Sequence, residues 1–174
     1  PAVWAAGDCA VTVHLMTGQP FWVALGTVAN KMGRVAGIVM GGGEASFPGV
    51  VGTAMSKHCG SEVARTGFSE KEAKDLGLAY RTASVKSITR AGYYPGVEPM
   101  HVKLLGEEGS GRLLGGQIVG GQGAAKRVDI LATAIQGKMT VQNLVDLDLG
   151  YAPPFSMAWD PVQVAGRELL KKIR

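Results

Sequence analysis

Cysteine is scarce in this 174-residue sequence, and its scarcity limits the chemistry that the chain can perform. The two cysteines, Cys9 and Cys59, lie far apart and outside any Cys-x-x-Cys pair. The three histidines, His14, His58 and His101, share no spacing typical of metal ligands, and no Gly-x-Ser-x-Gly elbow is present. We therefore expect no metal site and no hydrolytic triad. Both thiols are expected to be structural, packed side chains in a reducing, cytoplasmic setting.

Long apolar runs and targeting signals are missing as well. No run reaches the roughly 18 apolar residues of a membrane-spanning helix, and no basic segment followed by an apolar one marks a secretory signal. The net charge of +4 comes from scattered residues, so we expect neither a membrane nor a nucleic-acid partner. Apolar residues make up 46% of the chain, enough for one domain, or for a small domain plus a piece of another.

The beginning of the sequence predicts a strand without neighbours. Pro1 stands where a start methionine would, and the apolar stretch 2–6 runs up to Gly7-Asp8. A buried strand of this kind normally pairs with parallel neighbours from βαβ units. No upstream residues supply them, so we expect a truncated or dissected protein. An acidic side chain directly after a strand can bind a sugar-like hydroxyl, but Gly-Asp also makes ordinary turns, and the spacing alone leaves both open.

The residue patterns change near Pro48, where we place a boundary between regions 1–47 and 48–174. Helical spacing of apolar residues predicts a helix over 27–40 in the first region, ended by glycines 41–43. The second region is expected to hold strands in antiparallel pairs with most helices later in the chain, which is an α+β arrangement: an antiparallel sheet with helices packed on it. The predicted strands are two short ones around 56–60, then 80–89, 100–104 and 113–119. The predicted helices are one capped by Ser69 and Glu72, one over 124–136, one capped by Thr140, and one starting at Asp160-Pro161.

Glycine is abundant, so phosphate-binding loops need to be considered. The segment 120–123 (Gly-Gly-Gln-Gly) leads into a predicted helix, but no Lys-Ser/Thr of a P-loop follows. Lys126 also stands where the third glycine of a dinucleotide fingerprint is required. We interpret these glycines as a strand-to-helix turn, while a free phosphate at that helix start remains physically possible.

Two stiff segments carry tyrosines. Tyr151-Ala-Pro-Pro-Phe155-Ser is held extended by its prolines, and Tyr93-Tyr94-Pro95-Gly96 contains a Pro-Gly turn. Such a segment suits a ligand wall or an interface. An ordinary loop with buried aromatic side chains fits the spacing equally well. The presence of two such segments in one small domain favours a shared site.

Taken together, several motifs resemble the pyridine nucleotide-disulfide oxidoreductases, and the resemblance covers essentially the whole chain. Segment 3–10 resembles the motif that closes their FAD-binding domain, and 25–34 the helix that follows it under the flavin. Tyr151-Ala-Pro-Pro-Phe155-Ser with Trp159-Asp160-Pro161 is similar to the branch of coenzyme A-disulfide reductases, NADH oxidases and polysulfide reductases. The segments that resemble their dimerisation domain are 49–54, 66–73, 111–117 and 123–127.

The resemblance implies a role for the first region in binding FAD. Gly7 and Asp8 would hold the ribityl chain. Leu25, Gly26 and Thr27 would pass near the flavin ring, with the positive helix end aimed at its polar edge. Asn30, on the same helix, would contact substrate.

It also implies roles for the two tyrosine segments. Tyr151 and Phe155 would reach toward the partner subunit's flavin and active cysteine in a homodimer, so Phe155 counts as cofactor-binding. Tyr93 would join Tyr151 as a catalytic phenol near the disulfide or thiolate, and the neighbouring Tyr94 would contact substrate.

The implied parent protein is an FAD-dependent oxidoreductase that takes electrons from NAD(P)H to a small-molecule disulfide, a persulfide or oxygen. The family's redox cysteine and its Gly-x-Gly-x-x-Gly fingerprints are absent from this chain, so we expect the chain alone to be inactive. Glutathione and lipoamide reductases carry a His-Glu pair where this chain has its Tyr151–Phe155 segment, which argues against those branches. A lysine that some coenzyme A-disulfide reductases use has no clear counterpart here, since Trp159 stands near its place. The alternative is a non-catalytic homodimerisation module.

Overall fold

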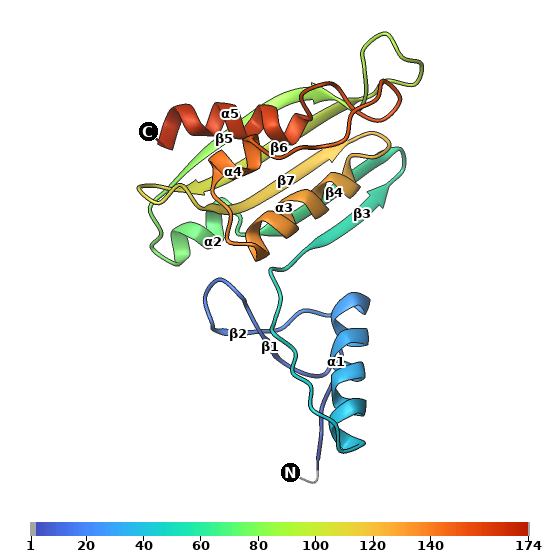
Figure 1. The fold of residues 1–174 in the computed structure, drawn as a ribbon, viewed down its shortest axis with the longest axis vertical. Helices are drawn as coiled ribbons and strands as arrows, with labels where there is room; N and C mark the ends of the chain where they lie inside the picture. The colour runs from blue at the N-terminus through green and yellow to red at the C-terminus, as the bar shows by residue number, and fades with distance from the viewer. Residues whose placement is uncertain (1–2, 174) are drawn as a thin grey trace. The chain divides into compact units, whose positions relative to one another are not determined.

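The computed structural model describes residues 3–173, and the chain divides into two compact units, Pro1–Gly52 and Thr53–Arg174 (Figure 1). The first unit holds a hairpin of two short strands, with two residues in each, and one long helix. The second holds a five-stranded sheet and all the other helices.

The first unit is built around helix α1. The predicted helix is confirmed: α1 buries Val28 and ends in the glycine run, where Gly42 takes a positive φ of 86° that a side chain would disfavour. A backbone bond from Val50 N to Val13 O, 2.9 Å long, ties the segment after the helix to the hairpin. The elements are β1 (Thr12–Val13), antiparallel to β2 (Pro20–Phe21), and α1 (Gly26–Met40).

The prediction of a strand over residues 2–6 is wrong for residues 3–6, the part of that range that the structure describes. Residues 3–6 have no regular structure, and Val3 is 85% exposed. Ala2 lies outside the described residues. A strand exists only through hydrogen bonds to a neighbouring strand, and no strand among residues 3–173 pairs with this segment.

The second unit is organised by an antiparallel sheet with the order β3-β4-β7-β6-β5. Strand β6 alternates as predicted, with Met100, Val102 and Leu104 buried and His101 exposed between them. The α+β class is confirmed. The strands are β3 (Ala54–His58), β4 (Ser61–Gly67), β5 (Tyr80–Ile88), β6 (Pro99–Glu107) and β7 (Leu113–Gly120).

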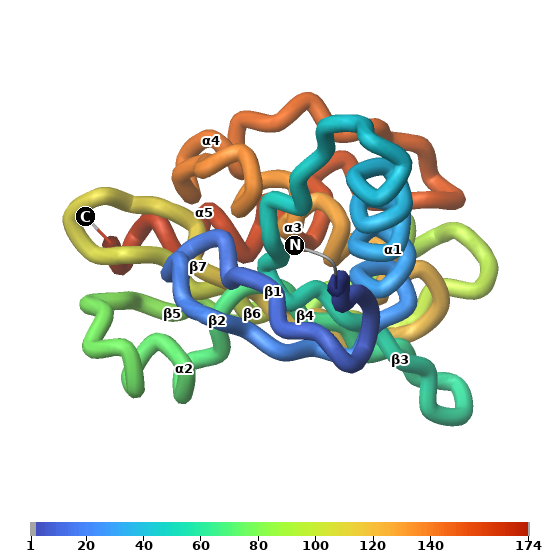
Figure 2. Tube along the Cα trace, turned by 90° about the horizontal axis from the view of Figure 1, so that it is seen from below, coloured from blue at the N-terminus to red at the C-terminus, as the bar shows by residue number. Residues whose placement is uncertain are grey.

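Three helices cover one face of this sheet, and Figures 1 and 2 both show α3, α4 and α5 on the same side of it. Gly116 on β7 permits the close approach, because a Cβ there would come within 2.5 Å of the Leu131 side chain of α3. The short helix α2 contacts the opposite face, where the Lys103 ammonium bonds the Glu70 carboxylate. The helices are α2 (Glu70–Asp75), α3 (Val128–Gln136), α4 (Val141–Val145) and α5 (Pro161–Ile173).

The predicted helix starts are confirmed. Ser69 and Glu72 form a capping box on α2, and Thr140 forms one with Asn143 on α4. Asp160 Oδ1 accepts the Val162 N–H at the start of α5. The helix predicted over 124–136 differs in its first turn, which is the 3-10 segment Ala125–Arg127. Its N–H groups bond three residues back, as in Arg127 N to Ala124 O at 3.2 Å, and this tightens the turn.

Candidate functional site

Backbone hydrogen bonds join the two tyrosine segments at one end of the sheet. The turn after β5 closes through Tyr94 N to Ala91 O at 2.8 Å, and the 151–156 loop closes through Phe155 N to Ala152 O at 2.9 Å. Ala91 N then donates to Pro153 O at 3.1 Å. This bond therefore holds together two segments that lie about 60 residues apart in the sequence.

The tyrosine hydroxyls meet on this backbone frame. The Tyr93 and Tyr151 side chains interact. The Tyr151 hydroxyl as a hydrogen-bonding neighbour, with lesser contributions from desolvation and from the charge that Tyr151 would carry, raises the pKa of Tyr93 above its ordinary value of 10.0. Tyr93 is 78% exposed and Tyr151 51% exposed, so the pair can be reached by a ligand from solvent. The structure thus brings together the two residues that the sequence singled out as phenols.

The other two predicted residues of these segments lie close by in the chain. Phe155 is 75% exposed and Tyr94 37% exposed, so neither ring is packed into the domain. The interpretation of the segments as ordinary loops with buried aromatic side chains is wrong for Tyr93, Tyr151 and Phe155.

A buried arginine lies beneath the two segments. The Arg127 guanidinium is within 2.8 Å of a carboxylate oxygen of Asp160, and both side chains are about nine-tenths buried. It also donates to the carbonyl oxygens of Thr89 and Phe155, at 2.9 and 2.8 Å. The sequence held one signal for it: Arg127 precedes Leu131 and Ile135 at four-residue spacing, so a charge stands on the buried stripe of this helix.

The predicted flavin-side residues gather in the first unit. Gly7 has a φ of 92°, and its missing Cβ would lie 3.7 Å from the Ala29 side chain in the first turns of α1. Trp22 Nε1 donates to Asp8 O at 2.8 Å, which fixes the turn and leaves the Asp8 side chain exposed.

The start of α1 is open. Leu25 is its N-cap and provides no side-chain acceptor, while Gly26 and Thr27 are exposed. A Cβ on Gly26 would meet nothing within 4 Å. The first N–H groups of a helix carry partial positive charge and point outward, so this end offers donors to an external polar group. Asn30 is exposed on the same helix, and its Nδ2 donates to Gly26 O at 2.9 Å.

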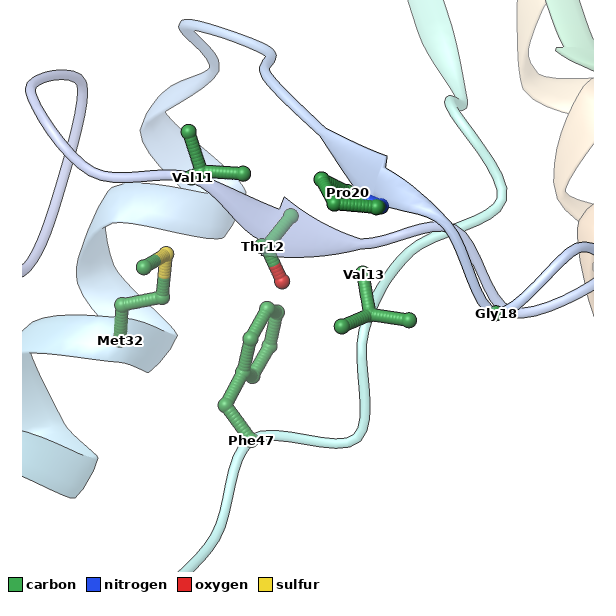
Figure 3. Close-up of a pocket in the computed structure, with 7 residues that line it drawn as sticks. All are labelled: Val11, Thr12, Val13, Gly18, Pro20, Met32 and Phe47. Atoms are coloured by element: carbon green, nitrogen blue, oxygen red, sulfur yellow. The ribbon is translucent and has the colours of Figure 1, made fainter.

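A pocket of about 420 Å³ lies between the hairpin and α1 (Figure 3). Figure 3 shows Met32 and Phe47 beside Thr12 and Val13. None of the predicted site residues lines it, and its lining includes no ionisable side chain. This pocket suits apolar contact and offers no group for acid–base chemistry. Its lining consists of Val11, Thr12, Val13, Gly18, Pro20, Met32 and Phe47.

The glycine turn before α3 does not offer a phosphate site. Glu98 Oε2 accepts the Gln122 N–H at 2.8 Å, and Glu62 Oε2 accepts the Ala125 N–H at 2.9 Å. Two carboxylates of the chain itself hold the donors that an anion would require, so the strand-to-helix interpretation stands.

Both cysteines are free and exposed, so the expectation of packed thiols is wrong. Each lies in a turn rather than in a buried element: Cys9 in the turn where Ala10 N bonds Gly7 O, and Cys59 at a φ of 52° between β3 and β4. Across residues 3–173, no group of three or more His, Cys, Asp or Glu side chains is placed to hold a metal ion. None of the described helices combines the length and apolar character that crossing a bilayer requires.

Comparison with known proteins finds similar sequences and structures over nearly the whole chain. The family model of the pyridine nucleotide-disulphide oxidoreductase dimerisation domain matches residues 53–161. The chain is 43% identical over 167 residues to an NAD(P)H coenzyme A polysulfide/persulfide reductase of Pyrococcus horikoshii, covering 96% of this chain and 37% of that protein. It is 35% identical over 173 residues to an NADH oxidase of Methanocaldococcus jannaschii, covering 99% of this chain and 38% of that protein.

A solved NAD-dependent persulfide reductase from A. fulgidus superposes with a TM-score of 0.94 at 46% identity, over 97% of this chain and 31% of that one. The chain therefore spans less than two fifths of the length of these relatives. With its matching domain and its sheet-and-helix fold, the chain belongs to the pyridine nucleotide-disulphide oxidoreductase family, of which it carries the dimerisation domain.

Proposed function

We propose that this chain is part of an FAD-dependent enzyme that reduces a small-molecule disulfide or persulfide at the expense of NAD(P)H, or reduces oxygen. In that enzyme it would supply the dimer interface and one wall of the active site. The observation that carries the proposal is that backbone hydrogen bonds join the segments of Tyr93 and Tyr151, whose exposed phenols interact. These acceptors are chosen from the names of two relatives, the coenzyme A polysulfide/persulfide reductase and the NADH oxidase.

The first unit fits the flavin cofactor by its chemistry. The uncapped start of α1 provides backbone donors and a positive helix end at Leu25, Gly26 and Thr27. The exposed Asp8 carboxylate provides an acceptor for ribityl hydroxyls, in a turn that packs against the same helix through Gly7. Bound there, FAD would supply the electron transfer between NAD(P)H and a sulfur or oxygen acceptor.

The phenol pair would hold a proton for the sulfur chemistry. A phenol with a pKa of 10.0 or higher is protonated at neutral pH, so the Tyr93 hydroxyl carries a proton there. A thiolate leaving from a disulfide needs such a donor beside it, either to protonate it or to orient it. Tyr151, whose side chain interacts with that of Tyr93, would share this role, while Tyr94 and Asn30 would contact the substrate.

A homodimer would complete the site. Tyr151 and Phe155 project from one domain with half or more of their surface exposed. We propose that they face the partner subunit's flavin and active cysteine, which this chain lacks. The two free thiols fit the reducing, cytoplasmic setting that we propose for this enzyme.

Substituting the phenols in the full-length parent protein tests the proposal. NAD(P)H oxidation is measured with coenzyme A disulfide, a coenzyme A persulfide and oxygen as acceptors. Tyr151→Phe is expected to lower kcat with a sulfur acceptor by about a hundredfold, because the proton donor pair is lost. Tyr80→Phe on β5 is the matched control and keeps the wild-type rate. A double variant, Tyr93→Phe with Tyr151→Phe, that reduces every acceptor at the wild-type rate would contradict the proposal.

The second candidate, a homodimerisation module without activity of its own, is favoured by one observation. The two cysteines of this chain lie in exposed turns and are paired neither with each other nor with another group as a redox centre. Adding FAD to the purified chain separates the candidates. A colourless chain that is dimeric by light scattering supports the module, and a chain that retains flavin absorbance after desalting argues against it.

A further inference from the structure

We propose that Arg127 is a positioning residue for the tyrosine pair, holding the Tyr93 turn and the Tyr151 loop together from beneath with one guanidinium group. The inference rests on the proposed function of the pair and adds the residue that sets its geometry. Arg127 touches neither phenol ring in any of its hydrogen bonds; it acts through the backbone of both segments.

The guanidinium group donates hydrogen bonds to four residues. Its Nη2 donates to the carbonyl oxygens of Thr89 and Phe155, at 2.9 and 2.8 Å, its Nη1 donates to Gly123 O at 3.1 Å, and its Nε donates to Asp160 Oδ2 at 2.8 Å. The residue is 9% exposed, so these bonds form away from water and few alternatives compete with them.

Two of these acceptors belong to the tyrosine segments. Thr89 forms the base of the Tyr93 turn: its N–H donates to Glu98 O at 2.9 Å, and its Oγ1 accepts the Glu98 N–H at 3.1 Å. Phe155 ends the Tyr151 loop. One nitrogen of Arg127 therefore links the base of one segment to the end of the other, which fixes the spacing between Tyr93 and Tyr151.

Asp160 holds the arginine in place. Its Oδ2 accepts from both Arg127 Nε and Ser156 Oγ, the latter at 3.0 Å, while its Oδ1 caps α5 through Val162 N. The buried positive charge is thus neutralised by a carboxylate that is itself anchored to a helix start. This matters because a buried charge without its partner is strongly destabilising.

A lysine at position 127 cannot form the same set of hydrogen bonds. A guanidinium group presents five N–H donors in a planar fork, whereas an ammonium group is a single point with three. At position 127 a lysine can neutralise Asp160 but cannot span the carbonyl oxygens of Thr89, Gly123 and Phe155 at once. The variant Arg127→Lys therefore keeps the charge and loosens the two segments.

The test is a pH titration of individual tyrosines by NMR, on the 174-residue chain with labelled tyrosine rings. In the wild type, Tyr93 is expected to titrate above its ordinary value, and Tyr151→Phe gives the curve without the partner hydroxyl. Arg127→Lys is expected to move the Tyr93 midpoint at least halfway to that curve, toward about 10. Arg81→Lys, which alters the exposed ion pair with Glu108, is the matched control and leaves the midpoint unchanged.

A folding defect in Arg127→Lys would not leave the inference undecided. Asp160→Asn keeps an oxygen for the Val162 cap but removes the carboxylate oxygen that accepts from Arg127 and Ser156, so it is expected to shift the Tyr93 midpoint in the same direction. Wild-type Tyr93 curves in the folded variants would overturn the inference. Because the titration needs neither flavin nor turnover, it can fail while the activity tests of the phenols succeed, and the reverse also holds.

Discussion

At the scale of single residues, the tightest constraint lies where β7 passes the end of β4. Phe68 N bonds Leu114 O at 2.9 Å, and a Cβ on Gly115 would come within 2.1 Å of Phe68 O. The obstructing atom is backbone and cannot rotate away. Glycine is required here for space.

Gly115→Ala is therefore expected to destabilise the chain by about 3 kcal/mol, because the strand must shift to admit one methyl group. The free energy of unfolding from urea titration, followed by circular dichroism, measures the effect. Gly60→Ala is the matched control: a Cβ there meets nothing within 4 Å, and the change should stay within about 0.5 kcal/mol. Equal stability of the two variants would show that the sheet yields at Gly115.

The sequence singled out Tyr93 and Tyr151, which lie together in the structure, but not the arginine beneath them. Tyr93 and Tyr151 stand out locally, because prolines and a turn glycine stiffen their segments. Arg127 bonds residues between 4 and 38 positions away, and no local pattern records such acceptors. The position of Arg127 on the apolar stripe of its helix was the one sign in the sequence that this charge is buried. The exposure of Cys9 and Cys59 was not predicted, because the usual burial of cysteine in proteins does not hold for a cysteine in a turn.

At the scale of elements, α2 shows how hydrogen bonds make a short helix sensitive to acid. Burial alone would raise the pKa of Glu72, but bonds from the Ser69 hydroxyl, the Ser69 N–H and the Arg65 guanidinium outweigh burial and lower it below 4.5. A carboxyl whose pKa is lower in the folded chain stabilises the fold above its ordinary pKa. That stabilisation is lost as the pH falls through the folded value.

Glu72→Gln is expected to reduce the free energy of unfolding by about 0.5 kcal/mol at pH 7, a small effect because the side chain is 41% exposed. Glutamine still completes a capping box, so the difference reports the charge. The gap between wild type and variant should close below about pH 4, as measured by urea titrations at several pH values. Glu44→Gln, outside the described ion pairs, is the control. A gap that persists at low pH would assign the effect to the cap instead.

Elements with strong local signals were predictable, and elements that need a distant neighbour were not. The capping boxes of α2 and α4 and the alternation of β6 can be recognised within a few residues, and all three are present. The strand expected over 2–6 has an apolar composition but no partner among the described strands, and residues 3–6 have no regular structure. The 3-10 turn Ala125–Arg127 that leads into α3 was not predicted. Carboxylates of the distant residues Glu62 and Glu98 fix the backbone there.

At the scale of the whole molecule, the buried core is unevenly distributed between the units. Among residues 3–173, the buried apolar side chains of the first unit are Val28 and Val51 alone. That unit also leaves Val11, Trp22 and Met40 each at least 59% exposed. Few buried contacts mean a low free energy of local opening.

Limited proteolysis of the 174-residue chain should therefore cut first within residues 3–52 and leave a resistant product that begins near Thr53. Mass spectrometry of the time course identifies the cuts. Hydrogen exchange on the intact chain is the companion measurement, with α1 amides exchanging faster than those of β6 and β7. Equal protection of α1 and the central strands would show that the first unit is stabilised by more than its own core.

The hydrogen bonds around Arg127 also bear on how this surface can change. They end on main-chain oxygens of the aromatic loop, and the loop's own closing bonds, Phe155 N and Ser156 N to Ala152 O, likewise join main-chain atoms. The path of the loop is thus largely independent of which side chains stand at 151 and 155. Substitution at those two positions therefore changes the chemistry of this exposed surface while the scaffold stays constant.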